Sequence, residues 1–454
     1  MVTISASHTV PPNQPTPHCH LWLSDMDQVS RQRHTPLVYI YKAKHDQYCI
    51  ERMKDSLSKI LVHYYPVAGR FSFTENGRME INCNAKGVIL LEAETEKTMA
   101  DFGDFSPSDS TKELVPTIDY NHPIEELPLL AVQLTRFNGG EGGLAVGVAW
   151  VHTLSDGLGC TRFFNSWAKI ARGDTLEPHE MPFLDRTLLK FSHTPLAPRF
   201  EHKELKPLPL ILGSSDDCSA KKSKKVTTAL FRLTSEQVEK LKKEANGDIP
   251  EGSRPYSRFE VIGAHIWRCA SKAGAFDQNQ PSVIRFNAEN RGRMVPPLPR
   301  NYFGNALTQT AATGYVGEIT SKPLSHVAQK IREAVEVVND EYIRSQIDVI
   351  RCQKHLDDAT ALFSPFSGNQ NPNLLFTSWM SMPMYEADFG KGKPVYFGLA
   401  YVSSHDRAYI FLSPDGDGSV IVSMFFQMSN MQLFKEFFYA DISTFGGTTL
   451  PSRL

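Results

Sequence analysis

Hydrophobic and polar positions follow two different periods along this chain, and together they predict a mixed α/β protein. Residues 144–150 form an apolar run without a charged side chain, which is typical of a strand buried on both faces. Shortly after it, Phe163, Trp167 and Ile170 recur at helical spacing, so we expect a helix over residues 158–170. Because such strands and helices mix without a repeat, we expect two α/β layers.

The same patterns place most other elements. Strands are expected at residues 37–41, 70–73, 79–83, 88–92, 129–136, 227–233, 283–288, 374–380, 395–401, 408–412 and 420–427. Helices are expected from residue 47, after Thr234, and at residues 259–271, 324–350 and 433–442. A polar, Pro- and Lys-rich stretch over residues 178–225 has little periodicity and predicts a long crossover.

These elements suggest a division of the chain. A chain of 454 residues is too long for a single core, so two domains are expected. We place an N-terminal domain at residues 1–180, a linker at 181–226 and a C-terminal domain at 227–454. Part of 360–390 is expected to pack with the N-terminal domain.

Composition narrows the class of protein. The net charge is −2, and the one basic cluster, Lys221, Lys222, Lys224 and Lys225, is typical of a solvated loop, so no nucleic-acid partner is expected. The seven cysteines are scattered without metal-ligand spacing, which favours reduced thiols, no metal and a cytoplasmic location. We find no signal-peptide pattern, and no apolar run approaches the roughly 20 residues of a membrane helix.

The strongest candidate for chemistry is His152, which lies between the predicted strand at 144–150 and the predicted helix at 158–170. Strand ends hold a side chain rigidly while a loop exposes it, so a neutral imidazole there could act as a general base. A lone histidine is more often a buried structural residue, but the following Asp156 and Gly157 favour a site. Asp156 either orients His152 or pairs with an arginine and holds the loop; we favour the second role. No Gly-x-Ser-x-Gly motif occurs, which disfavours a covalent acyl-enzyme.

Two other segments, each taken alone, are only weak indications of a functional site. One is a charged, Gly-rich turn over residues 385–394, and the other is a rigid loop over residues 290–306 that carries Arg291 and Arg293.

Taken in order, however, the chain resembles the plant BAHD acyl-CoA-dependent acyltransferases over nearly its full length. The matching segments are His34-Thr35-Pro36, residues 64–70, His152 with Asp156-Gly157, Arg291-Gly292-Arg293 with its Pro-rich tail, and Asp388-Phe389-Gly390 with Gly392.

This resemblance implies a fold of two chloramphenicol-acetyltransferase-like α/β domains joined by a crossover, with a solvent channel between them. It implies that His152 is the general base, that acyl-CoA is a co-substrate rather than a bound cofactor, and that the protein is a monomer. Asp388 would pair with Arg291 or Arg293 in a structural role. The acceptor would be lined by Thr35, Tyr39, Thr377 and Trp379, and the coenzyme A phosphates would meet Ser253, Arg254, Ser257 and Arg258.

The chain departs from the family pattern at two positions. Lys391 stands where the family usually has tryptophan, so it is a possible oxyanion donor or a solvent-facing residue. Ser381 stands where members that acylate shikimate or quinate carry an arginine, which argues against an acidic acceptor.

Four other segments look most like the hydroxycinnamoyl-CoA:spermidine branch: His18-Cys19-His20-Leu21, residues 24–28, Pro383-Met384-Tyr385-Glu386 and Gly392-Lys393-Pro394. Glu386 is either a candidate for binding a polyamine or a solvated turn carboxylate. We therefore expect transfer of a hydroxycinnamoyl or other aromatic acyl group to a polyamine nitrogen, such as spermidine. The alternatives are an alcohol acceptor, such as an alkaloid or phenolic hydroxyl, and a non-catalytic ligand-binding relative. A peptide-synthetase condensation domain is disfavoured because Val151 replaces the second histidine such domains carry.

Overall fold

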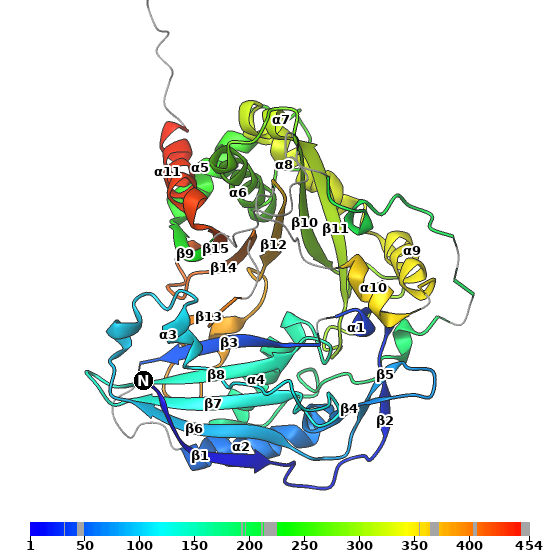
Figure 1. Ribbon diagram of the computed structural model, residues 1–454, viewed down its shortest axis with the longest axis vertical. Helices are drawn as coiled ribbons and strands as arrows, with labels where there is room; N and C mark the ends of the chain where they lie inside the picture. The colour runs from blue at the N-terminus through cyan, green and yellow to red at the C-terminus, as the bar shows by residue number, and fades with distance from the viewer. Residues whose placement is uncertain are drawn as a thin grey trace, which may run out of the picture.

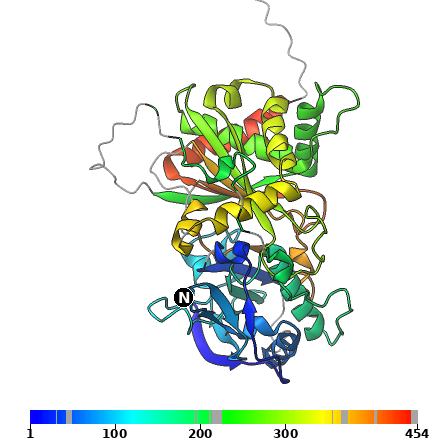
Figure 2. The same cartoon turned by 90° about the vertical axis from the view of Figure 1, so that its right-hand side faces the viewer.

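Two sheets, one above the other in Figure 2, organise the computed structural model of this chain. The structure describes residues 1–30, 32–42, 50–191, 194–195, 197–209, 212, 225–353, 355–363, 372–402 and 406–445. Three of the basic residues at 221–225, together with Cys49 and Cys218, lie outside these ranges. The fold class is the expected mixed α/β arrangement.

The first sheet holds the strand that leads to His152. Within the described residues its strands are, in spatial order, β1 (Thr3–Val10), β6 (Val88–Thr95), β7 (Leu130–Phe137), β8 (Gly143–Val151), β3 (His34–Tyr41) and β13 (Tyr396–Leu399). Helices α2 (Ile50–His63) and α4 (Gly157–Ala171) lie against this sheet (Figure 1), and their apolar side chains share its buried core. β8 is buried along almost its whole length because strands flank it on both sides and α4 covers one face.

The second sheet is built from the later part of the chain. Its described strands are, in spatial order, β11 (Leu307–Tyr315), β10 (Pro281–Glu289), β12 (Leu374–Ser378), β14 (Arg407–Leu412), β15 (Val420–Gln427) and β9 (Val226–Leu233). Helices α5 (Ser235–Asn246), α6 (Arg258–Gly274), α8 (Leu324–Glu336) and α11 (Met428–Thr444) share a core with these strands. This core is separate from that of the first sheet.

Smaller elements complete the described chain. A short sheet contains β2 (His20–Trp22), β5 (Met79–Asn82) and β4 (Arg70–Phe73). The remaining α-helices are α1 (Asp25–Gln28), α3 (Asp109–Lys112), α7 (Val316–Ser321), α9 (Asp340–Arg351) and α10 (Leu356–Leu362).

A late segment of the chain returns to the first sheet. Residues 374–378 form β12 of the second sheet, but Met384, Ala387 and Phe389 are buried in the core of the first. β13 then pairs antiparallel with β3, with Phe397 opposite Tyr39. Residues 379–395, which include the Gly-rich turn over residues 385–394, therefore connect the second sheet to the first.

Most of the predicted strands are confirmed, and so are the helices at 158–170 and 259–271. The single helical region expected over residues 324–350 is wrong, because two helices, α8 and α9, occupy it. Asn339 begins the second one, where its side chain accepts a 2.9 Å hydrogen bond from the backbone N–H of Tyr342. Asparagine favours this capping position, so the hydrophobic period continues while the helix does not. The strand β11 was not predicted.

Candidate active site

His152 lies in a short turn between β8 and α4. β8 ends at Val151, and α4 begins at Gly157 with Asp156 as its cap. The turn is held on the sheet side, because β8 pairs with both β7 and β3 and places Val151 opposite His34. His152 itself is half-buried, so its imidazole is fixed by a rigid strand end but is not sealed in the core.

The carboxylate of Asp156 is directed into the protein. Its oxygens lie 2.9 and 3.1 Å from the guanidinium of Arg291 and accept hydrogen bonds from the backbone N–H groups of Gly159 and Ala306. Burial alone would lower the pKa of Arg291, but the neighbouring carboxylates of Asp156 and Glu289 raise it. Of the two roles considered for Asp156, the structure shows the arginine pairing.

The turn after β12 brings a second set of residues to the start of α4. A side chain on Gly157 would meet Met382 at 3.0 Å and the indole nitrogen of Trp379 at 3.9 Å. Trp379 is half-buried between aromatic rings, with the ring centroids of Tyr409 and Phe397 at 5.1 and 5.6 Å. The absence of a side chain at Gly157 therefore allows the Trp379 turn to approach the His152 turn closely.

The other residues expected on the acceptor side differ in exposure. Thr35 on β3 and Thr377 on β12 are half-buried, while Ser381 and Glu386 are exposed. Tyr39 does not line an open surface, which corrects the expectation. Its ring is only 1% exposed and packs between Phe164 and Phe397, and burial raises the pKa of its hydroxyl.

The four residues expected to meet coenzyme A lie at the start of α6. Ser257 caps this helix through the backbone N–H of Glu260. Arg254 is about half exposed and forms ion pairs with Glu260 and Glu336 at 2.8 and 3.3 Å. Hydrogen bonding to Glu260 raises the pKa of Arg254, so its charge is already partly balanced. Ser253 is exposed and Arg258 is half-buried.

The loop with Asp388 is organised differently from the expectation. Asp388 Oδ1 accepts hydrogen bonds from the backbone N–H groups of Gly390, Lys391 and Gly392 at 2.7–3.0 Å. Both glycines have positive φ, which suits residues without a side chain. The expected pairing of Asp388 with Arg291 or Arg293 is therefore wrong.

Each of those arginines has other partners. Arg291 pairs with Asp156 and Glu289, and Arg293 donates to the backbone carbonyls of Val335 and Val338 at 3.0 and 2.7 Å. The Asp388 loop is instead anchored by Arg172, which donates to the Asp388 carbonyl. Arg172 caps the far end of α4, so the loop and Arg291 contact opposite ends of this helix.

The same placement corrects the oxyanion role considered for Lys391. α4 has 15 residues and therefore spans about 22 Å. His152 precedes its first turn, whereas the loop of Lys391 contacts Arg172 after its last turn. Lys391 is exposed, and its extended side chain is far too short to cover that distance.

Two side chains from distant segments contact the His152 turn, Arg186 from the crossover and Asn305 from the loop before β11. Asp27 from α1 contacts both of them. Asn305 lies in the loop over residues 290–306, and Asp27 lies in the segment 24–28 that resembles the spermidine branch, but neither pattern indicated a contact with the His152 turn. Nothing in the sequence could have shown that these three distant residues meet.

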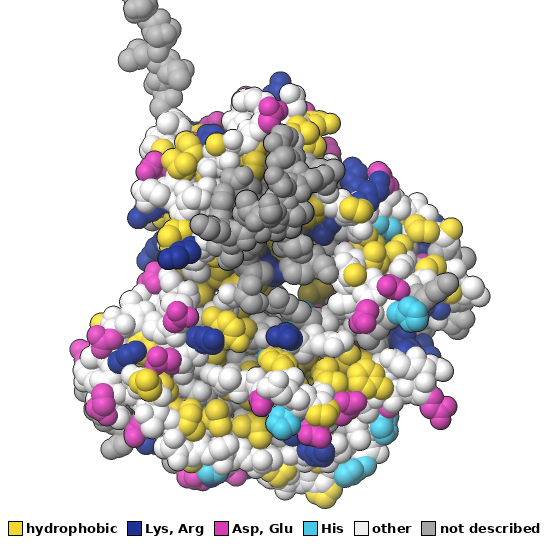
Figure 3. Space-filling model, viewed as in Figure 1, with side chains coloured by type: hydrophobic (Ala, Val, Ile, Leu, Met, Phe, Trp, Pro, Cys, Tyr) yellow, Lys and Arg dark blue, Asp and Glu magenta, His cyan; other side chains and the backbone are white. Residues whose placement is uncertain are grey.

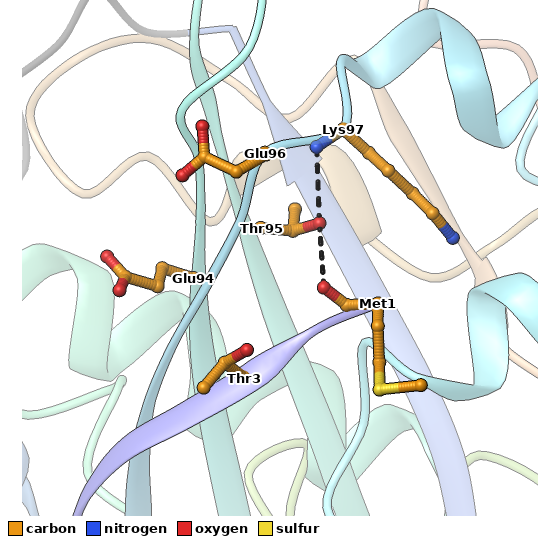
Figure 4. A pocket seen from close by; sticks show the side chains of 6 residues that line it. All are labelled: Met1, Thr3, Glu94, Thr95, Glu96 and Lys97. Atoms are coloured by element: carbon orange, nitrogen blue, oxygen red, sulfur yellow. Dashed lines mark hydrogen bonds between the residues drawn. The ribbon is translucent and has the colours of Figure 1, made fainter.

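Other features lie away from this site. A surface hollow at the edge of β1 and β6 is lined by Met1, Thr3, Glu94, Thr95, Glu96 and Lys97, none of which belongs to the His152 turn (Figure 4). Among the described residues there is no cluster of His, Cys, Asp or Glu able to hold a metal ion. On the face in Figure 3, basic and acidic side chains are interspersed over the lower half. No helix in the described part of the chain is long and apolar enough to cross a membrane.

The site is therefore a half-buried histidine at a strand end, followed by a turn that the Asp156–Arg291 pair joins to the second α/β half. Comparisons with known proteins show that a chain of this kind is an acyltransferase. Residues 1–441 match the model of the Transferase family. The chain therefore belongs to this family, whose members include the BAHD acyltransferases.

Curated relatives match almost end to end. Hydroxycinnamoyl-CoA:piscidic acid hydroxycinnamoyltransferase of Actaea racemosa is 39% identical, with 97% of this chain and 100% of the relative covered. Hydroxycinnamoyl-CoA:5-hydroxyanthranilate N-hydroxycinnamoyltransferase of Avena sativa is 36% identical, and shikimate O-hydroxycinnamoyltransferase of Nicotiana tabacum is 34% identical; each match covers 96% of this chain and 99% of the relative.

Solved structures share the fold. Vinorine synthase superposes with a TM-score of 0.71 at 22% identity, covering 95% of this chain and 96% of that one. F. graminearum TRI101, complexed with coenzyme A and T-2 mycotoxin, gives 0.76 at 16% identity, covering 94% and 99%.

Proposed function

We propose that this protein transfers a hydroxycinnamoyl group from coenzyme A to a polyamine nitrogen, such as one of spermidine, with His152 as general base. The observation that carries the donor is the end-to-end match, at 34–39% identity, to three enzymes whose names specify hydroxycinnamoyl transfer. The placement of His152 at the end of β8 supports its role.

In the proposed reaction the acceptor attacks the thioester carbonyl directly. A free polyamine nitrogen has a pKa near that of lysine, about 10, so the reactive species is its neutral minority form. As the nitrogen–carbon bond forms, the neutral imidazole of His152 removes the proton that the nitrogen can no longer hold. The tetrahedral intermediate then expels the coenzyme A thiolate, which the imidazolium of His152 reprotonates. Atoms and charge balance, and His152 returns to its neutral form.

Trp379 is a candidate donor for the oxyanion of that intermediate. Its indole nitrogen lies close to Gly157, at the start of α4, and within the described residues it has no hydrogen-bond acceptor. An N–H group held near the start of α4 by packed aromatic rings is suited to stabilise a charge that develops only in the transition state. We assign to Trp379 the role that the sequence suggested for Lys391.

The polyamine proposal rests on the charges of the turn after β12. Met382 and Trp379, which approach the His152 turn, are uncharged, and Ser381 between them is a small exposed residue. A carboxylate acceptor would leave its charge unpaired at a serine, whereas a cationic acceptor needs no positive partner there. Glu386 is exposed and five residues further on, and we propose that it attracts the distal ammonium group of the polyamine.

A second candidate is a carboxylate-bearing acceptor. The names of the three relatives specify piscidic acid, 5-hydroxyanthranilate and shikimate, and all three compounds carry a carboxylate. The acceptor could then be an alcohol or an arylamine, and a cation outside the Trp379 turn would have to bind it.

The experiment that separates these candidates is a matched acceptor panel. The purified full chain is incubated with p-coumaroyl-CoA and with spermidine, shikimate or anthranilate, and products are identified by mass. We expect acylated spermidine at a rate at least tenfold above the other two. Faster turnover of shikimate or anthranilate would overturn the polyamine proposal but leave the acyl donor intact, and no acyl transfer with any acceptor would overturn both.

Several further assignments belong to this proposal. Ser253, Arg254, Ser257 and Arg258 are proposed to meet the coenzyme A phosphates, since a capped helix start with arginines suits anion binding. Acyl-CoA is proposed to act as co-substrate with no permanently bound cofactor. We also propose a monomeric, cytoplasmic protein with domains divided at residues 181–226. Free cysteines at all five described positions agree with a reducing environment.

A further inference from the structure

The turn that carries His152 is held by its backbone carbonyl groups. The carbonyls of His152 and Thr153 accept hydrogen bonds from Asn305 Nδ2 at 2.9 and 3.3 Å. The carbonyl of Leu154 accepts one from Arg186 Nη2 at 2.6 Å. The next carbonyl, that of residue 155, accepts one from the indole of Trp150 at 3.2 Å. Each of four consecutive carbonyls therefore has a side-chain donor.

Two of these donors converge on one buried carboxylate. Asp27 Oδ1 accepts hydrogen bonds at 2.8 Å from both the backbone N–H and the side-chain amide of Asn305. Asp27 Oδ2 lies 3.1 Å from Arg186 Nη1, and both side chains of that ion pair are 0% exposed. The same oxygen accepts the backbone N–H of Ser24 at 2.9 Å, which fixes Asp27 within the first turn of α1.

This cluster is separate from the Asp156–Arg291 pair. Asp156 fixes the beginning of α4, after the turn, and its carboxylate bonds to Gly159, Arg291 and Ala306. Asn305, in contrast, contacts the two carbonyls at the beginning of the turn, including that of His152 itself. Two buried carboxylates therefore hold the two ends of the turn through different partners.

We propose that Asn305 is a positioning residue for His152, and that Asp27 and Arg186 hold it and the turn in place. This inference rests on the proposed role of His152 as general base. Asn305 does not touch the substrate; it fixes the peptide plane from which the His152 side chain projects. Asp27 accepts one N–H of the Asn305 side-chain amide, which orients the other N–H toward the two carbonyls. A general base must lie within hydrogen-bond reach of its proton, so a displacement of about 1 Å can cost about 10²-fold in rate.

A purely structural role makes a different prediction. If Asn305 only contributed stability, its removal would lower the melting temperature, but the folded enzyme would turn over at the normal rate. If it positions His152, its removal lowers kcat in the folded enzyme while the KM for the acyl donor stays the same. The split between kcat and KM therefore separates the two roles.

The test compares Asn305→Ala with Asn301→Ala. Asn301 lies in the same loop, but its side-chain amide donates to the carbonyl of Met181 at 2.6 Å and not to the His152 turn. Each full-length variant is assayed below its melting temperature with p-coumaroyl-CoA and the best acceptor of spermidine, shikimate and anthranilate. Slow hydrolysis of p-coumaroyl-CoA by water is followed as thiol release, which needs no added acceptor.

We expect Asn305→Ala to lower kcat by 10- to 100-fold with the KM for p-coumaroyl-CoA within twofold, and Asn301→Ala to change neither by more than twofold. Equal kcat values in the two variants would overturn the inference, as would a loss that appears only as a raised KM. His152→Ala is run alongside: if it retains full activity, the role of His152 as base fails, whereas an inactive His152→Ala with an unaffected Asn305→Ala refutes only the positioning role.

A second pair of variants covers the case in which Asn305→Ala does not fold. Asp27→Asn keeps an oxygen for Asn305 but removes the charge that holds Arg186. Asp25→Asn, on the same helix, disturbs the ion pair with Arg78 instead, which has an N–O distance of 2.8 Å. We expect a three- to tenfold fall in kcat for Asp27→Asn at constant KM and no fall for Asp25→Asn; equal kcat values in both would contradict the inference.

Discussion

The replacement of Asp156 by asparagine tests the structural role of this residue. The carboxylate is 1% exposed and pairs with Arg291, whose side chain is 4% exposed. Asparagine has nearly the same volume and keeps one oxygen for the backbone N–H of Gly159, so the cap of α4 survives. What disappears is the negative charge beside a buried guanidinium, together with the oxygen that accepts the N–H of Ala306.

The size of the effect follows from the remaining partners of Arg291. Removing one member of a buried ion pair costs about 3–5 kcal/mol when the other charge is left uncompensated. Here Glu289 lies 2.9 Å from Arg291, and the carbonyl of Tyr302 accepts a further hydrogen bond. These contacts retain part of the compensation, so we expect Asp156→Asn to lower the free energy of unfolding by about 2–3 kcal/mol. Asp156→Ala also removes the cap, which adds about 1 kcal/mol.

Urea unfolding measures the stability, and steady-state kinetics on the folded variant measure the chemistry. Because the Asp156 carboxylate is bonded to Arg291 and two backbone N–H groups, we expect kcat of Asp156→Asn to fall by less than tenfold. An aspartate that orients a catalytic histidine loses about 10⁴ in kcat when replaced by asparagine, with the geometry intact. A loss of that size in a variant of normal stability would refute the structural role.

Three further predictions concern other parts of the molecule. Lys391→Ala should leave kcat within twofold in steady-state assays, because Lys391 lies beyond the far end of α4; a tenfold fall in a folded variant would contradict this placement. In a urea titration, Gly147→Ala should lower the free energy of unfolding by at least about 3 kcal/mol, because the added Cβ would lie 1.8 Å from the carbonyl oxygen of Leu114. The control Gly292→Ala should be nearly neutral, because no atom lies within 4 Å of the added Cβ. Burial lowers the pKa of His265 to about 4, against an opposing hydrogen bond to the Phe438 carbonyl. The unfolded chain therefore binds more protons than the folded chain between pH 6.5 and about 4, and the free energy of unfolding should fall by about 3 kcal/mol as the pH falls through that window. His265→Asn should flatten this part of the profile of unfolding free energy against pH. An unchanged slope in that variant would show that His265 is not the cause.

The sequence was sufficient to predict those strands and helices whose structure is decided by the local periodicity of apolar residues. The apolar run before His152 became β8, and the helical spacing of Phe163, Trp167 and Ile170 became α4. Both elements are set by burial within one contiguous segment, so their period is visible in the sequence alone. The prediction of one helix over residues 324–350 was wrong at Asn339, because a capping residue can interrupt a helix while the spacing of its apolar residues continues.

Side-chain contacts between residues that are far apart in the sequence could not be predicted. Asp388 was expected to pair with Arg291 or Arg293, but the structure pairs Arg291 with Asp156, because the Asp388 loop lies at the other end of α4. Asn305 and Arg186 carry no local signal for their contacts with the His152 turn. Such contacts depend on how the two sheets and the crossover are placed in space, and the local pattern of apolar residues does not encode that placement.

The central claim is that His152 acts as the general base for acyl transfer from coenzyme A. It is tested most directly by the turnover of His152→Ala with p-coumaroyl-CoA and spermidine, shikimate or anthranilate, compared with the unsubstituted chain at equal concentration of folded protein. Because general-base catalysis contributes about 10²–10⁴ in rate, we predict a fall in kcat of at least 100-fold with an unchanged melting temperature. Turnover within a few-fold of the unsubstituted chain would contradict the account.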